Sequence, residues 1–99
     1  MAKFDGVIEA VRYKNGKIDM VRAYERRGAT FSDHVLLDRK TLMNRLNSGK
    51  RFVTGSRREF LASTFEVGQT VRLAGRDDKQ IITTQVHSDH DELVGVPAF

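Results

Sequence analysis

Residues 7–24 read VIEAVRYKNGKIDMVRAY, and this stretch decides the fold because it predicts a β-hairpin. Asn15 and Gly16 stand between two runs that are rich in β-branched and aromatic residues. Asn-Gly is the preferred pair for a two-residue type I′ turn, since both residues tolerate a positive φ. The sequence therefore predicts two antiparallel strands joined by a turn at residues 15–16.

A two-residue turn also predicts which residues of the two strands face each other. Counting outward from the turn places Glu9 opposite Arg22 and Arg12 opposite Asp19. Each of these opposite-charge pairs contributes at most about 1 kcal/mol to the stability of the hairpin. Apolar residues occur on both faces of the ribbon, which indicates a hairpin that curls around a core or is covered on both sides.

The sequence predicts one helix, near residues 39–48. Asp38 is a suitable N-cap, and Leu37 and Leu42 occupy the two positions of a hydrophobic staple. Gly49 follows the last apolar position and is typical of a helix end.

The first turn of this helix carries two basic residues, Arg39 and Lys40. The helix dipole prefers anions there, so each residue costs a few tenths of a kcal/mol. We expect the Asp38 carboxylate to offset this cost.

The remaining apolar segments predict short strands, with turns at Gly55-Ser56 and at Gly68. These strands are expected at residues 34–37, 51–53, 60–65, 70–73 and 80–85. Residues 56–59 also match a capping box, so a short helix over residues 57–63 is the alternative. We favour a strand because this segment is bordered by Phe and Thr residues that prefer a pleated surface.

Together these elements predict a single mainly β domain over residues 1–85, either a small partly open barrel or a strongly bent antiparallel sheet with one short helix. The order of elements resembles, in outline, that of the five-stranded oligonucleotide-binding barrel, whose helix lies between its third and fourth strands. An SH3-like barrel fits the same order. Residues 86–99 form an acidic C-terminal tail, for which both docking on the body and fraying are expected alternatives.

The composition excludes several classes of protein. The chain has no cysteine, which excludes disulfides, a thiolate nucleophile and Cys-bound zinc. It contains no apolar run long enough to span a membrane and no apolar signal region at its start. We therefore expect an intracellular, cytoplasmic protein without a membrane partner.

The net charge of +4 is distributed unevenly along the chain. Residues 26–58 carry nine Lys and Arg against two acidic residues, whereas residues 86–99 carry three acidic residues and no Lys or Arg. Such asymmetry is typical of proteins with a polyanionic partner, although Lys and Arg also occupy ordinary solvated surfaces. Phosphate binding requires several cations on one surface, because affinity grows with the number of counterions displaced.

Five arginines are the predicted anion-binding and nucleic-acid-binding residues. They are Arg51, Arg57 and Arg58, supported by Arg26 and Arg27. Tyr13 and Tyr24 are the candidates for base stacking, although the hairpin pairing places each of them opposite an apolar residue.

No catalytic constellation occurs in the sequence. Ser32, Asp33 and His34 are adjacent along the chain, which is poor geometry for a triad. His87 and His90 lie in the tail, where a metal site would not be held rigid. We expect no catalytic residue, no metal, no cofactor and no small-molecule substrate.

Two functional classes remain. The first is a small non-catalytic interaction module that binds a protein partner or associates with itself as a homodimer, through open sheet edges. The alternative is a polyanion-binding domain, with nucleic acid as the ligand, that uses the basic segment 26–58.

Overall fold

The computed structural model describes residues 4–28, 30–57, 65–75, 80–85 and 90–99. Residues 58–63, for which strand and helix were the alternatives, lie outside the described residues. The elements are β1 (Gly6–Lys14), β2 (Lys17–Arg27), β3 (Thr30–Phe31), β4 (Val35–Asp38), α1 (Arg39–Asn47), β5 (Phe52–Arg57), β6 (Phe65–Ala74) and β7 (Ile81–Thr83). The predicted mainly β domain with one short helix is confirmed.

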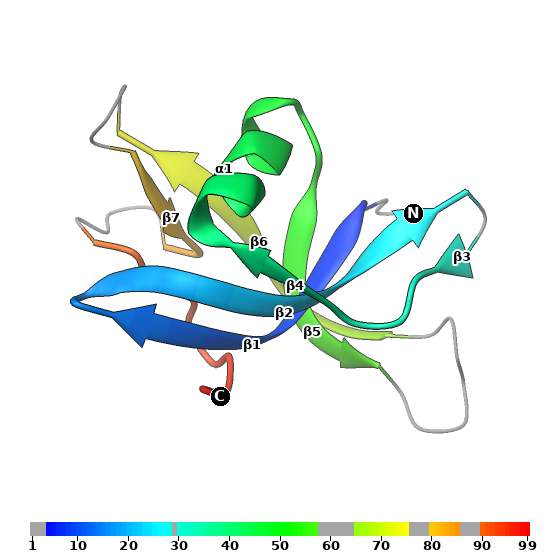
Figure 1. The fold of residues 1–99 in the computed structure, drawn as a ribbon. Helices are drawn as coiled ribbons and strands as arrows, with labels where there is room; N and C mark the ends of the chain where they lie inside the picture. The colour runs from blue at the N-terminus through cyan, green and yellow to red at the C-terminus, as the bar shows by residue number, and fades with distance from the viewer. Residues whose placement is uncertain (1–3, 29, 58–64, 76–79, 86–89) are drawn as a thin grey trace.

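The strands form a mixed sheet in the order β3-β2-β1-β5-β6-β7, and β4 pairs with β2 beside β3 (Figure 1). One pair, β1 and β5, is parallel, and the other described pairs are antiparallel. A parallel pair needs a crossover connection, which β4 and α1 supply here. The described strands do not close into a barrel, so the sheet is open and bent, and it is mixed rather than wholly antiparallel.

The turn of the β1–β2 hairpin is the predicted one. Asn15 and Gly16 have φ values of 54° and 77°, as a type I′ turn requires. Pairing follows the prediction next to the turn, where Lys14 faces Lys17, and again at the far end, where Ile8 faces Ala23.

Between these ends the predicted pairing is wrong by one residue. Val11 faces Val21, although the count from the turn placed it opposite Met20. The shift starts at an extra residue in β2, Asp19, and is cancelled by an extra residue in β1, Glu9. Each is a β-bulge, which bends a strand and increases its twist. The shifted pairing is thus confined to Ala10–Arg12 of β1.

Both predicted charge pairs of the hairpin form in spite of the shift. Arg12 Nε lies 3.0 Å from Asp19 Oδ2, and Arg22 Nε lies 2.9 Å from Glu9 Oε1. The bulged residues are thus the two acidic partners.

Helix α1 has the predicted boundaries. The Asp38 carboxylate accepts a hydrogen bond from the Thr41 N–H at 2.7 Å, and this bond lowers the pKa of Asp38. Ser48 ends the helix, and Gly49 follows with a φ of 91°. Leu42, on the inner side of α1, is fully buried in the core.

The predicted turns at Gly55-Ser56 and Gly68 are wrong, because these residues lie inside the paired strands β5 and β6. A Cβ atom on Gly55 would overlap the carbonyl oxygen of Glu66, and one on Gly68 would overlap the Thr54 hydroxyl. Glycine within a strand marks such a close approach of two backbones.

The core has two parts. The larger cluster lies between the sheet, α1 and the C-terminal segment, and includes Ile8, Val11, Ile18, Leu42, Phe52, Ile82 and Leu93. The smaller one lies at the end of the sheet near β3, where Val7, Tyr24 and Val53 pack with Phe4, Phe31 and Phe65.

The described residues of the acidic tail, 90–99, pack on the body of the domain. Val11 N–H donates to the Pro97 carbonyl at 2.9 Å, and Phe99 N–H donates to the Val11 carbonyl at 3.1 Å (Figure 1). Leu93 is buried in the larger core cluster.

Asp91 joins this segment to the rest of the domain. Its side chain is 1% exposed and accepts hydrogen bonds from the N–H groups of Ile18 and Ile82, at 2.8 and 3.0 Å. It also pairs with Arg39, whose Nε lies 2.8 Å from Oδ2 and whose Nη2 lies 3.2 Å from Oδ1. Burial by itself raises the pKa of Asp91, but the hydrogen bonds from Arg39, Ile18 and Ile82 together lower it below the usual value.

This pair explains why an arginine occupies the first turn of α1. The sequence predicts that Asp38 offsets the cost of Arg39 and Lys40. Instead, Arg39 reaches across to Asp91 and also donates to the carbonyl of Gln80 at 2.8 Å.

Replacement of Leu42 by alanine should lower the free energy of unfolding by about 2–5 kcal/mol, because it leaves a cavity under the helix. Chemical denaturation measures this change. The matched control is Lys40→Ala on the exposed side of the same helix, which should stay within about 0.5 kcal/mol of the parent. Equal stability of the two variants would contradict the packing of α1.

Replacement of Asp91 by asparagine should lower the free energy of unfolding at neutral pH by about 3 kcal/mol, because Arg39 loses its buried partner. The folded pKa of Asp91 lies below its unfolded value of about 3.9, so this stabilisation is complete above that pH and is lost as pH falls through the folded pKa. The stability difference between parent and variant should therefore shrink below about pH 4.

Denaturation curves at several pH values measure this dependence. Asp19→Asn is the control, because its pair with Arg12 is exposed to solvent and contributes about 0–1 kcal/mol. A difference between Asp91→Asn and the parent that does not change with pH would contradict the assignment.

Candidate anion-binding site

Two of the predicted arginines, Arg26 and Arg51, are brought to the same end of the sheet by Asp5. The Asp5 N–H donates to the Arg51 carbonyl at 2.7 Å, and the Asp5 carbonyl accepts from the Arg26 N–H at 2.7 Å. The Asp5 carboxylate also accepts the Arg51 N–H at 2.8 Å. The chain entering β1 therefore lies between the end of β2 and the start of β5.

A hollow of about 270 Å³ opens at this end of the molecule. Its lining comes from the end of β2, the last turn of α1 and the segment that leads into β5. The lining residues are Asp5, Glu25, Arg26, Gly28, Arg45, Lys50 and Phe52.

Two basic residues of this lining are positioned by the end of α1. The Lys50 N–H donates to the Arg45 carbonyl at 3.1 Å, so the chain turns back beside the helix end. The C-terminal end of a helix carries a partial negative charge, which favours cations. We name this hollow, with Arg26, Arg45 and Lys50 around it, the basic hollow.

Arg26 is held in place more firmly than an ordinary surface arginine. Its Nε donates to the carbonyl of Phe4 at 2.9 Å. Its guanidinium lies 4.7 Å from the centre of the Phe31 ring and 6.0 Å from the centre of the Phe4 ring. No carboxylate of the described residues forms an ion pair with it, and its Nη groups donate to none of the described residues.

The charge around the basic hollow remains positive after the acidic residues are counted. Arg45 Nε pairs with Glu25 at 3.2 Å, and the Asp5 carboxylate is the second acid in the lining. The exposed residues Arg27 and Arg51 directly adjoin lining residues in the chain. The three lining cations, Arg26, Arg45 and Lys50, and the two lining carboxylates leave an excess of one positive charge.

The predicted anion contacts are therefore brought together in part. Arg26 lines the basic hollow, whereas Arg27 and Arg51 are exposed neighbours of lining residues in the chain and are not part of the lining. Arg57 ends β5, where its backbone pairs with Phe65 and its side chain is not described. Arg58 lies outside the described residues.

Sequence reasoning missed Arg45 and Lys50 as members of the site. The predicted end of the helix was the signal that could have identified them, because a helix that ends at residue 47 places Arg45 in its last turn and Lys50 just after it. Arg39 belongs to the same basic segment but is neutralised by Asp91 elsewhere in the fold.

The two tyrosines do not form a stacking surface at this site. Tyr24 is 5% exposed, and its hydroxyl donates to Glu9 at 3.0 Å, so it belongs to the core. Tyr13 is 41% exposed, but it lies near the hairpin turn, where its hydroxyl accepts the Leu93 N–H at 2.9 Å.

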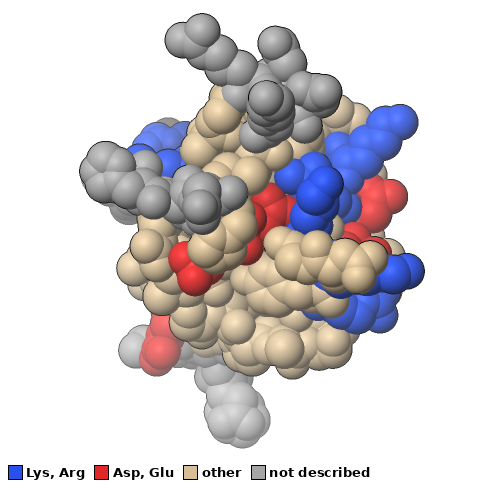
Figure 2. All heavy atoms as spheres, turned by 90° about the vertical axis from the view of Figure 1, so that its left-hand side faces the viewer, with Lys and Arg blue, Asp and Glu red and all other residues tan. Residues whose placement is uncertain are grey.

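Basic side chains also occur elsewhere on the surface. Figure 2 looks onto the side where the β1–β2 turn lies, and Lys and Arg gather along one part of this face with Asp and Glu among them. Lys14 and Lys17 flank this turn, at the opposite end of the hairpin from Arg26.

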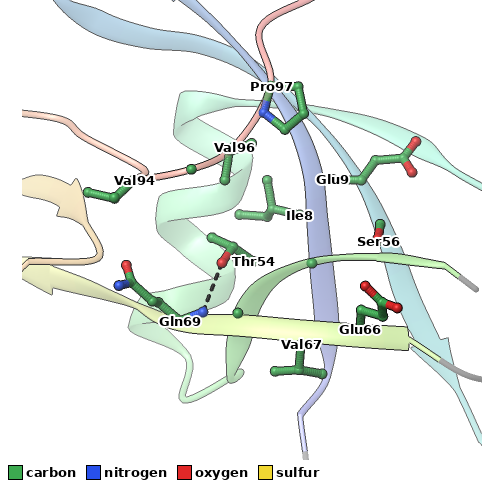
Figure 3. Close-up of a pocket in the computed structure, with 13 residues that line it drawn as sticks. Ile8, Glu9, Thr54, Ser56, Glu66, Val67, Gln69, Val94, Val96 and Pro97 are labelled. Carbon is green, nitrogen blue, oxygen red and sulfur yellow. Dashed lines mark hydrogen bonds between the residues drawn. The ribbon is translucent and has the colours of Figure 1, made fainter.

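A second and larger groove, of about 550 Å³, lies between β5, β6 and residues 94–97 (Figure 3). Its described lining includes Glu9 and Glu66 but no Lys or Arg. The Glu9 carboxylate already lies 2.9 Å from Arg22 and 3.3 Å from His34. This groove therefore does not suit an anion.

Within the described ranges, no three His, Asp or Glu side chains gather as a metal site. His87, one of the residues considered for a metal, lies outside these ranges. The described part of the chain also contains no helix with the length and apolar character that a membrane crossing requires. A cytoplasmic location stays a prediction.

Comparison of the chain with protein-family models, curated proteins and solved structures finds no match. The geometry of the basic hollow is therefore the basis on which a function is proposed.

Proposed function

We propose that this domain binds a polyanion at the basic hollow and that nucleic acid is the class of ligand. The observation that carries the proposal is the Arg26 guanidinium, which is held by the Phe4 carbonyl and the Phe31 ring and has no acidic partner among the described residues. A guanidinium presents a planar set of donors that matches a phosphate group. Because this one is already immobilised, it loses little side-chain freedom when it binds.

The neighbouring cations support the same proposal. Lys50 lines the same hollow, as does Arg45, which pairs with Glu25. Binding to a nucleic acid backbone gains free energy from the counterions that such cations release. Three cations that come from separate segments of the chain release more counterions than one exposed arginine does.

Fluorescence anisotropy with a labelled oligonucleotide tests the proposal. The parent protein should bind at about 50 mM salt, and its affinity should fall steeply as the salt concentration rises. The double variant Lys50→Gln/Arg51→Gln should weaken binding and reduce the slope of log affinity against log salt by about 1–2.

The matched control is Lys14→Gln/Lys17→Gln, which removes the same charge at the hairpin turn and should bind nearly as the parent does. Absence of binding at about 50 mM salt, or equal weakening by both double variants, would contradict the proposal. Arg57→Ala/Arg58→Ala is a further arm, and unchanged affinity would remove these two residues from the site.

A second candidate function is self-association through β4. Leu36 is 58% exposed on this strand, which pairs with β2 on one side and with no described strand on the other. An open edge presents unpaired backbone groups that a second copy can pair with. Burial of Leu36 between two copies would add an apolar contact.

Light scattering tests this candidate. A homodimer should have twice the monomer mass of 11.2 kDa, and Leu36→Lys should return it to the monomer. Val67→Lys is the control. Val67 is likewise an exposed aliphatic residue, with 49% of its surface accessible, but it lies on β6 instead of β4. A monomeric parent at high protein concentration would overturn the candidate.

A further inference from the structure

We propose that the basic hollow takes single-stranded nucleic acid, with a phosphate in the hollow and an unstacked base against the outer face of Arg26. This inference rests on the proposed function and adds the kind of nucleic acid. It starts from the aromatic rings beside the hollow, because binding by charge alone would not need them.

Four rings form this aromatic cluster. The ring centres of Phe4 and Phe31 are 5.6 Å apart, those of Phe31 and Phe65 are 4.8 Å apart, and those of Tyr24 and Phe65 are 5.2 Å apart. Tyr24 is buried, whereas the three phenylalanines are partly exposed. The cluster is a rigid support at the surface, because each ring packs against another.

Arg26 belongs to both the aromatic cluster and the basic hollow. It lines the hollow, and its guanidinium lies over Phe31 at 4.7 Å. The guanidinium is thus held against the surface of the aromatic cluster, and the residue as a whole is exposed. Bases that are unstacked from their neighbours stack on aromatic rings and on guanidinium planes.

This arrangement favours a single strand over a duplex. In a duplex both faces of each base are covered by neighbouring bases, so a stacking surface gains nothing. A duplex also requires many phosphate contacts for tight binding, and the excess of one positive charge in the lining of the hollow is small. A single strand can combine these few contacts with stacking.

Four probes test the inference: thymidine and uridine single strands of about 12 nucleotides, a duplex of the same length, and inorganic polyphosphate. Both single strands should bind at least about tenfold more tightly than the duplex. A preference between thymidine and uridine strands would identify DNA or RNA as the source, and either preference supports the inference.

Arg26→Lys is the diagnostic variant because lysine keeps the positive charge but lacks the planar guanidinium group. It should lower the affinity for single strands by about fivefold or more, and by a larger factor than the affinity for polyphosphate, because polyphosphate loses only the planar donors whereas a single strand also loses the stacking plane. Phe31→Leu should act in the same direction, since it removes the support under the guanidinium.

Arg12→Lys is the matched control. Arg12 also lies over an aromatic ring, that of Phe99 at 5.5 Å, but on another part of the surface. It should leave all four affinities unchanged, and circular dichroism should show that each variant is folded.

The outcomes separate this inference from the function on which it rests. Equal binding of duplex and single strands, or unchanged single-strand binding by Arg26→Lys, would overturn the inference and leave polyanion binding intact. Failure of the parent to bind any of the four probes would overturn both.

Discussion

The fold depends on the buried carboxylate of Asp91. An ionised group at 1% exposure is tolerated only when its charge is paired and its oxygens are hydrogen-bonded. Here the partners come from three places: the start of β2 at Ile18, β7 at Ile82 and the first turn of α1 at Arg39. One side chain thereby holds the C-terminal segment, the sheet and the helix together. The same interaction also removes Arg39 from the basic surface and so helps to decide which cations remain for a ligand.

The basic end of the molecule follows a different principle, because its cations are gathered by backbone hydrogen bonds. Asp5 bonds to the peptide groups of both Arg26 and Arg51, and the end of α1 places Lys50 next to Arg45. The acidic residues nearby reduce the charge without cancelling it. What distinguishes this end from the mixed charges elsewhere is an arginine that a carbonyl and an aromatic ring hold in one position.

Elements specified by a few neighbouring residues were predicted well, and those that depend on another strand were not. Asn15-Gly16 and Asp38 act on the backbone directly beside them, so the hairpin turn and the helix start were predicted correctly. The bulges at Glu9 and Asp19 were missed because they cancel each other and leave both hairpin ends in the expected pairing. Gly55 was interpreted as a turn residue, yet it is required by the close approach of β6.

The sequence by itself determined the mainly β class, the position of the helix and the concentration of cations in residues 26–58. These follow from local backbone preferences and from composition, which need no knowledge of distant contacts. Only the tertiary structure decided which cations meet. Arg26 and Arg45 come to one hollow, whereas Arg39 is neutralised by a residue far along the chain. The physical reason is that charges interact through space, and the order of the strands, with its parallel β1–β5 pair, sets those distances.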